Sequence, residues 1–225
     1  MQCNPFDVAG RRCSSEETKL IAPKRLICIA GGDGSGKTTQ IARLSAALQA
    51  QGHTIAPVTI WDAFLDTSVA SKLPFRSADI YGYLKLLSPL SRAHFLFHAL
   101  HLALELAGKR DADTVLLNAY WYKYFATEVA HGGEPSVLRQ LAAGFPEPDL
   151  TFYLTISPAD ALARKRQRSD YESGYGDKDE FLAFQERSHA TIETLAEEFA
   201  WIRLDGTTAP ADLTTAMSER IREDS

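Results

Sequence analysis

The sequence predicts a three-layer α/β domain, in which a mostly parallel five-stranded sheet carries helices on both faces. Five short apolar runs alternate with longer segments of helical periodicity, which is the pattern of a parallel sheet. No internal repeat and no long Pro/Gly/Ser linker divides the 225 residues, so we expect one domain. Hydrophobic residues make up 45% of the chain and charged residues 24%, which excludes disordered, collagen-like and disulfide-scaffold proteins.

The predicted strands are short and apolar. They cover residues 26–30, 54–60, 114–117, 150–156 and 201–204. Pro57 has no N–H to donate to a neighbouring strand, so the second strand should lie at an edge of the sheet or begin late. Cys28 falls inside the first strand and should be buried as a small hydrophobic residue.

The predicted helices follow the strands. They cover residues 36–51, 91–109 and about 178–199, and two more begin at Pro158 and after Pro210. In the first helix Ile41, Leu44 and Leu48 share one face, which should pack on the sheet. Gly52 then stands just past the last periodic residue, where a left-handed glycine commonly ends a helix.

Charge and targeting signals exclude several classes of partner. The net charge of −5 lacks the basic excess of a nucleic-acid-binding protein. Residues 1–24 form a polar tail without the apolar stretch of a secretory signal, and residues 94–108 are too short and too polar to span a membrane. Three cysteines without a CxxC pair suit a reducing compartment. We therefore expect a cytoplasmic protein with a tail (1–24) and one folded domain (25–225). The sequence leaves its oligomeric state open, and a homodimer is one alternative.

Residues 31–38, GGDGSGKT, match the phosphate-binding pattern G-x-x-x-x-G-K-[ST]. Glycines let the backbone curl so that successive N–H groups point at phosphate oxygens, next to the positive end of the following helix. Lys37 should reach the β- and γ-phosphates, and the Thr38 hydroxyl should bind Mg²⁺. The alternative is a chance glycine-rich turn, but the motif lies between a strand and a helix, as a P-loop requires. The predicted ATP-binding residues here are Gly31, Gly34, Ser35, Gly36, Lys37, Thr38 and Thr39.

Four segments carry a resemblance to a known family. They are residues 32–40 (GDGSGKTTQ), 148–154 (PDLTFYL), 184–187 (FQER) and 204–207 (LDGT). In this order and spacing they resemble the thymidylate kinases, a branch of the P-loop nucleoside monophosphate kinases, over about residues 25–222. The resemblance implies the P-loop NTPase fold and transfer of the γ-phosphoryl group of ATP, with Mg²⁺, to a nucleoside monophosphate. Its first-choice acceptor is dTMP, so the expected partners are nucleotides.

A basic cluster follows the fourth strand, where a lid (here about 161–180) lies in the resembling family. Charge spreads over the oxygens of a migrating phosphoryl group, so cations besides Lys37 are needed. Arg164 and Arg168 share a helix face, and Arg166 projects from another face, towards ATP in our interpretation. The family carries its catalytic arginine on the P-loop or on the lid. This P-loop has none, so Arg164 and Arg168 are predicted to be catalytic; a merely solvated basic face is the alternative.

Asp33 is the predicted acidic residue of the catalytic site. The third strand ends in Asn118, which cannot offer Mg²⁺ a carboxylate. Asp33 matches an acidic P-loop residue of the family, and we expect it, with Thr38, to hold the metal and its water shell or to steer the acceptor phosphate. No general base is required, because a phosphate acceptor is already anionic. Adenine is expected near Gly206 and Thr207.

The acceptor site departs from the family pattern. The family's Asp-Arg-Tyr after the third strand reads here Asn118, Ala119 and Tyr120, so the arginine that grips the acceptor phosphate is missing. Lys123, one helical turn later, is a candidate substitute. The family's base-facing Phe and Arg, four residues apart, correspond to Phe97 and His101. The predicted acceptor-binding residues are Asp62, Phe97, His101, Tyr120, Lys123 and Glu172, the last matching an acidic lid position.

Other interpretations stay open at this stage. Asp62 is either a turn residue or the base of a deoxynucleoside kinase with a hydroxyl acceptor. Another small phosphorylated acceptor and a degenerate, regulatory ATP-binding module are further alternatives. His94, His98, His101 and Glu105 share a helix stripe that could bind zinc, although a polar face is favoured. The aromatic residues of 120–125 could clamp a base or pack in the core.

Overall fold

The computed structural model describes residues 24–72, 79–164, 171, 174–175 and 178–224. It contains a parallel five-stranded sheet in the order β2-β3-β1-β4-β5. The strands are β1 (Arg25–Ala30), β2 (Ile55–Val58), β3 (Thr114–Asn118), β4 (Leu150–Thr155) and β5 (Ile202–Asp205). The predicted α/β class and all five strands are confirmed. β2 is shorter than predicted and lies at an edge, as Pro57 indicates.

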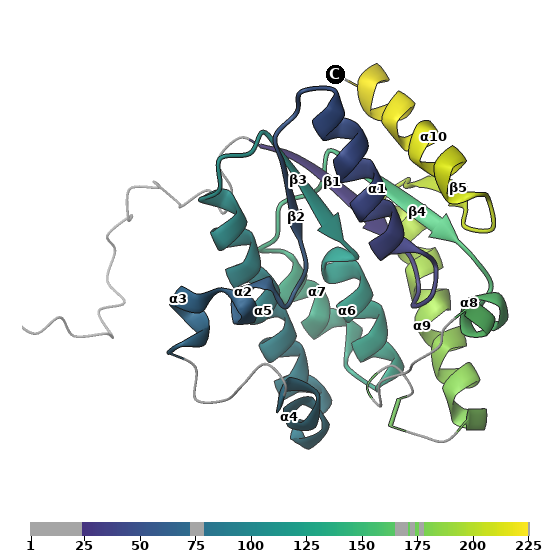
Figure 1. Ribbon diagram of the computed structural model, residues 1–225. Helices are drawn as coiled ribbons and strands as arrows, with labels where there is room; N and C mark the ends of the chain where they lie inside the picture. The colour runs from purple at the N-terminus through teal and green to yellow at the C-terminus, as the bar shows by residue number, and fades with distance from the viewer. Residues whose placement is uncertain (1–23, 73–78, 165–170, 172–173, 176–177, 225) are drawn as a thin grey trace, which may run out of the picture.

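Helices cover both faces of the sheet (Figure 1). One face carries α1 (Lys37–Ala50) and α10 (Pro210–Glu223), and the other carries α5 (Pro89–Gly108), α6 (Tyr120–Ala130) and α9 (Lys178–Glu198). The strands alternate accordingly, since Ile27 and Ile29 face α1 while Cys28 faces the larger core. The shorter helices are α2 (Asp62–Leu65), α3 (Thr67–Ala70), α4 (Ile80–Leu86), α7 (Pro135–Ala142) and α8 (Pro158–Arg164).

The sequence pattern does not predict α2, α3, α4, α6 or α7, of which α6 and α7 are the longest. The first turns of α6 are aromatic almost all round, so the segment shows no helical periodicity. Tyr120 and Tyr122 are completely enclosed, and Trp121 packs against Phe125 and Phe199. Core packing is therefore the role of most of this aromatic cluster.

The loops that follow β1 and β3 leave the sheet at the same edge. These strands are neighbours, and Ile29 of β1 pairs with Asn118 at the end of β3. β1 continues into α1, and β3 continues directly into α6. Because both strands are parallel, the N-termini of the two helices lie next to each other at the carboxyl edge, where open α/β sheets bind ligands.

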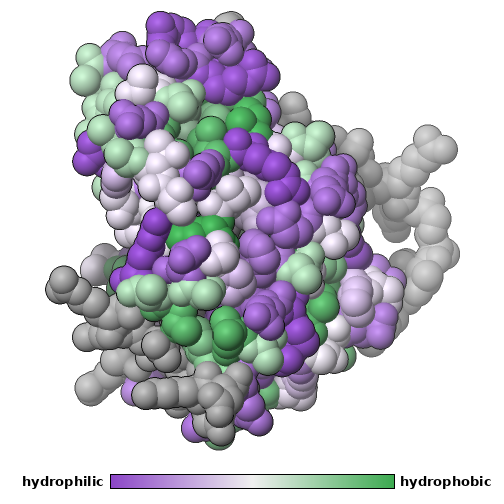
Figure 2. Space-filling model, turned by 90° about the vertical axis from the view of Figure 1, so that its right-hand side faces the viewer, coloured by the Kyte–Doolittle hydropathy of each residue, from purple (hydrophilic) through white to green (hydrophobic). Residues whose placement is uncertain are grey.

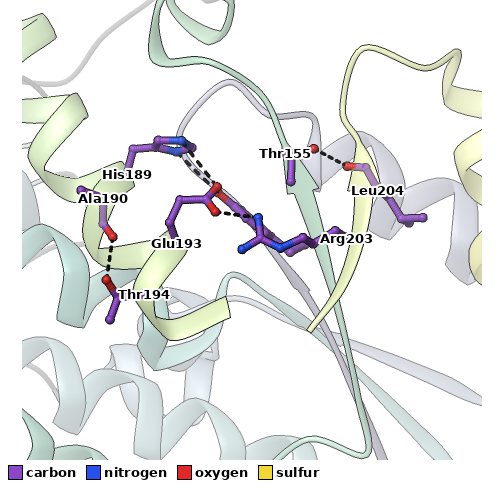
Figure 3. A network of polar contacts seen from close by, with 8 residues as sticks. Thr155, His189, Ala190, Glu193, Thr194, Arg203 and Leu204 are labelled. Carbon is purple, nitrogen blue, oxygen red and sulfur yellow. Dashed lines mark hydrogen bonds and ion pairs between the residues drawn. The ribbon is translucent and has the colours of Figure 1, made fainter. Parts of the chain in front are cut away.

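A polar network fixes α9 to the sheet (Figure 3). The Tyr153 hydroxyl of β4 donates to Glu193 over 2.5 Å, and Arg203 of β5 donates to the same carboxylate over 2.6 Å. These bonds hold the pKa of Glu193 below its usual range against the opposing effect of burial. The network sets the position of the α9 face that approaches the P-loop.

The side formed by α8, α9 and α10 mixes hydrophilic and hydrophobic residues, with hydrophilic side chains gathered towards the end of α10 (Figure 2). Within the described part of the chain, no helix combines the length and the apolar character that crossing a membrane requires. The predicted tail lies almost wholly outside the described residues, as do Arg166, Arg168 and Glu172 of the predicted lid.

Candidate active site

A cavity of about 900 Å³ opens at the carboxyl edge of the sheet. It brings together residues from the P-loop, the ends of β2 and β3, the first turns of α6, the end of α8 and the loop after β5. Among the predicted site residues, those that line it are Asp33, Gly34, Ser35, Gly36, Lys37, Thr38, Thr39, Lys123, Arg164, Gly206 and Thr207. The volume is within the range of small-molecule sites in proteins.

The P-loop has the curled backbone that its glycines predict. Gly34 has a φ of +86°, and a Cβ atom there would lie 2.5 Å from the carbonyl oxygen of Ala161. Gly36, with a φ of +98°, turns the chain into α1. Lys37 donates to the carbonyl oxygen of Gly32 over 2.6 Å, so its ammonium group is folded back over the loop. The loop is therefore preformed, with a cation placed where a phosphate group would lie.

The N-termini of α1 and α6 both face this cavity. Their N-cap residues, Gly36 and Ala119, make no side-chain capping hydrogen bond, and in this sense we call both N-termini uncapped. α6 begins at two left-handed residues other than glycine, Ala119 (φ +72°) and Tyr120 (φ +49°). Such backbone conformations cost about 1 kcal/mol or more each and concentrate at functional sites. Two uncapped helix N-termini at one cavity suit two phosphate-bearing ligands.

The residues near Thr38 fit a magnesium ion that is held mainly by substrate oxygens. The amide of Asn118 donates to the Thr38 hydroxyl over 3.4 Å, and Asp33 lines the same cavity. Hydroxyl and carboxylate oxygens are the ligands that Mg²⁺ prefers, usually one or two from the protein with substrate phosphates and water. Across the described residues, no three His, Cys, Asp or Glu side chains come together in an arrangement that could hold a metal ion.

Lys123 reaches back from the second turn of α6 to the P-loop. Its ammonium nitrogen lies 2.5 Å from an Asp33 carboxylate oxygen, and the two side chains are 18% and 14% exposed. The pair also borders a small second cavity formed with residues of α9, including Gln185, Ser188 and His189. A cation thus stands one helical turn beyond Ala119, as the sequence suggests, and its partner is an acidic residue of the P-loop.

Arg164 lies on the side of the cavity where adenine is expected. It donates to the carbonyl oxygen of Gly206 over 2.8 Å. The N–H of Gly206 donates to Thr155 over 2.8 Å, and a Cβ atom at this glycine would lie 2.9 Å from that same oxygen. Only glycine fits there without a shift, so the loop after β5 lies close to the end of β4, and the Arg164 bond joins it to α8.

Three predicted acceptor residues gather around Phe145 and do not line the cavity. The rings of Phe97, His101 and Tyr120 lie 5.7, 5.6 and 5.8 Å from that of Phe145. Tyr120 is fully buried, and its hydroxyl donates to Pro146. α5 runs away from the carboxyl edge of the sheet, and none of its residues is among those that line the cavity. Among the described residues, the aromatic side chains that line the cavity are Trp61 and Tyr124. Tyr124 belongs to the aromatic cluster of 120–125, whereas Trp61 is not among the predicted site residues.

Asp62 also has a local role. Its carboxylate accepts hydrogen bonds from the N–H of Thr59 over 3.0 Å and from the Thr59 hydroxyl over 2.6 Å. These bonds close the turn between β2 and α2, and Asp62 is not among the residues that line the cavity. The turn interpretation of this residue is the one that the geometry supports.

A buried ion pair on the lid side is absent from the sequence predictions. Arg92, in the first turn of α5, donates to both oxygens of Glu128 on α6, at 2.8 and 3.0 Å. The Tyr171 hydroxyl donates to the same carboxylate over 2.9 Å. Burial raises the pKa of Glu128, and the three hydrogen bonds oppose that rise. An arginine and a tyrosine 79 residues apart give no local signal of this contact.

His131 packs beside this ion pair. Its ring lies 5.4 Å from that of Tyr171 and 4.5 Å from that of Phe184. Burial, together with the positive charge of Arg92, lowers the pKa of His131 to about 4, so the imidazole is neutral at physiological pH. The His94 stripe on α5 has no comparable environment: His101 contacts Glu105 at 3.2 Å on an exposed surface.

Comparison with known proteins identifies the family. No family model matches the chain. The thymidylate kinase of Chlorobium luteolum is 32% identical over 184 residues, which are 77% of this chain and 78% of that protein. The thymidylate kinase of Trichlorobacter lovleyi is 28% identical over 87% of this chain and 95% of its own length. That of Arabidopsis thaliana is 31% identical over 76% and 61%. With the P-loop and the sheet described above, these similarities establish that the chain belongs to the thymidylate kinase family.

Proposed function

We propose that the protein transfers the γ-phosphoryl group of ATP to dTMP, giving ADP and dTDP. The observation that carries this proposal is that Lys37 and Lys123 line one shared cavity, on two helices whose N-termini are uncapped. A kinase that transfers a phosphoryl group to an acceptor phosphate needs cations and N–H donors around the donor phosphates and around the acceptor phosphate. The relatives of this chain are named thymidylate kinases, and this name supports the choice of dTMP as the acceptor.

In the proposed reaction an oxygen of the acceptor phosphate attacks the γ-phosphorus of ATP. The bond between that phosphorus and the β–γ bridging oxygen breaks, and ADP leaves. The P-loop N–H groups and Lys37 would hold the ATP phosphates, Lys123 would face the acceptor phosphate, and Thr38 with Asp33 would orient Mg²⁺. When bound, Mg²⁺ would neutralise charge on the phosphate oxygens. Positioning and charge supply the catalysis, since the acceptor needs no deprotonation.

The lid assigned to residues 161–180 and its catalytic arginines belong to this proposal. So do the tail at 1–24, the catalytic domain at 25–225, the cytoplasmic location and a homodimeric assembly. Of the arginines, Arg164 is the one whose contact is described, and it lies against the β5 loop. The contacts of Asp62 with Thr59 favour a phosphate acceptor over a hydroxyl acceptor, because a base for a hydroxyl would have to leave this turn.

Product analysis tests the proposal. Purified protein is incubated with ATP, Mg²⁺ and one acceptor at a time: dTMP, the other common nucleoside monophosphates, or thymidine. We expect dTDP and ADP in equal amounts with dTMP, and loss of turnover by at least about a hundredfold in Lys37→Ala. Phosphorylation of thymidine but not of dTMP would contradict the proposal in favour of a deoxynucleoside kinase. If the protein consumes no ATP with any of these acceptors, the result would favour a regulatory ATP-binding module.

A further inference from the structure

The ion pair between Asp33 and Lys123 occupies the acceptor side of the cavity. The ammonium group and the carboxylate are both more than four-fifths enclosed, and they line the cavity together with Ala119 and Asn118. Side chains on a helix point towards its N-terminus, so Lys123 extends over the first turn of α6 towards the uncapped N–H groups. The position between the Lys123 ammonium group and the first turn of α6 favours an anion, and the Asp33 carboxylate occupies it.

We infer that the Asp33 carboxylate is a placeholder which the phosphate group of the acceptor displaces from Lys123. This inference rests on the proposed function and adds how the acceptor site of that function works. A phosphate group carries more charge than a carboxylate and has more acceptor oxygens, so it can take over the ammonium group while also meeting the α6 N–H groups. Lys123 exchanges one partner for the other, and the Asp33 carboxylate is released towards the ATP side of the cavity.

The geometry explains why the exchange runs through lysine. Ala119 lines the cavity and has only a methyl side chain, so no guanidinium group can bind both partners together at that position. The ammonium group of Lys123 is a compact charge on a flexible stem, and it can turn from one anion to another. Competition follows, because every acceptor that binds must first break the contact with Asp33 or share the cation with it.

The inference predicts opposite effects for the two members of the pair. Asp33→Asn removes the competing carboxylate, so the affinity for dTMP should rise about three- to tenfold even though turnover falls. Lys123→Met removes the cation, so the affinity should fall at least about tenfold. Thymidine lacks the phosphate group, and its binding should change in neither variant. In a Lys123→Met background, Asp33→Asn should raise the affinity for dTMP by a smaller factor. No ion pair is then left to break, and the substitution relieves only the repulsion between the Asp33 carboxylate and the acceptor phosphate.

Isothermal titration calorimetry with the full chain measures these affinities without turnover. Glu198→Gln is the matched control, because it removes a carboxylate from the exposed pair with Arg139, outside the cavity, and should leave dTMP binding unchanged. Thermal unfolding of each variant establishes that it is folded. An Asp33→Asn variant that is folded and binds dTMP no tighter than the wild type would overturn the placeholder and leave the proposed function standing. A wild-type protein that binds no dTMP would overturn both.

Discussion

At the scale of single residues, the P-loop glycines show most directly how this sequence makes its site. Gly34 lies so close to the carbonyl of Ala161 that even a methyl group would overlap with it, and its φ of +86° is unfavourable for other residues. The close contact fixes α8, and therefore Arg164, against the P-loop. Gly34, a residue of the phosphate-binding loop, therefore also positions the start of the predicted lid segment.

Replacing this glycine should damage the ATP site without unfolding the protein. For Gly34→Ala we expect ATP affinity to fall at least about tenfold, because the loop must shift to relieve both the overlap and about 1–2 kcal/mol of backbone strain. Gly82→Ala is the matched control: Gly82 lies inside α4 with open space around it. It should leave ATP binding unaltered and stabilise the helix slightly. Equal ATP affinity in both variants would count against the preformed loop.

Arg164 offers a second prediction at this scale. Arg164→Ala should lower kcat/KM for ATP at least about tenfold, since the guanidinium group lines the cavity beside Gly206. Steady-state kinetics with varied ATP separates two roles: a change confined to KM indicates contact on the adenine side, and a change in kcat indicates contact with the migrating phosphoryl group. Arg222→Ala, on the exposed end of α10, is the control. Unchanged kinetics for Arg164→Ala would show that this side chain is merely solvated.

At the scale of elements, α5 and α6 are joined through the buried pair of Arg92 and Glu128, to which Tyr171 adds a hydrogen bond. Replacing one partner of such a pair leaves a buried charge without compensation, which costs about 3–5 kcal/mol. The neutral ring of His131 covers Tyr171 on this side of the molecule. α5, α6 and Tyr171 are thus held together by a buried polar cluster that tolerates no additional charge.

This environment predicts a pH-dependent stability. The pKa of His131 is about 4 in the folded protein, against about 6.5 when unfolded. Between these values the unfolded chain binds more protons, so stability falls as the pH falls from about 6.5 towards 4. From pH 7 to pH 5 the wild type should lose about 1–2 kcal/mol more than His131→Phe, which keeps an aromatic ring. Urea unfolding at the two pH values measures the difference; parallel losses would show that His131 titrates normally.

At the scale of the whole molecule, the sequence predicts the α/β class, the five strands, the edge position of β2 and the P-loop. Each of these depends on local patterns: apolar runs, a proline, and glycines at fixed spacing. α6 escapes prediction because its aromatic residues face the core on several sides, so no period of 3.6 residues appears. The rings around Phe145 could not be placed because the register of α5 against the sheet depends on tertiary packing.

The acceptor side illustrates the same limit. The sequence shows that the family's arginine is replaced by Ala119 and that Lys123 follows one turn later. It does not show that Lys123 is paired with Asp33, or that Trp61 and Tyr124 line the cavity, since these contacts join segments far apart in the chain. Chemistry carried by one motif is thus predictable, whereas chemistry assembled from several elements requires the fold.

The central claim is that one cavity holds both nucleotides with their phosphate groups meeting at the P-loop. Calorimetric titration with adenosine and thymidine joined through five phosphates tests this claim most directly, because such a molecule must occupy both subsites at once. We predict one molecule bound per chain, at least about a hundredfold tighter than ATP or dTMP alone, and competition with both nucleotides. If the joined molecule binds no tighter than ATP and competes with ATP but not with dTMP, that result would contradict a shared cavity.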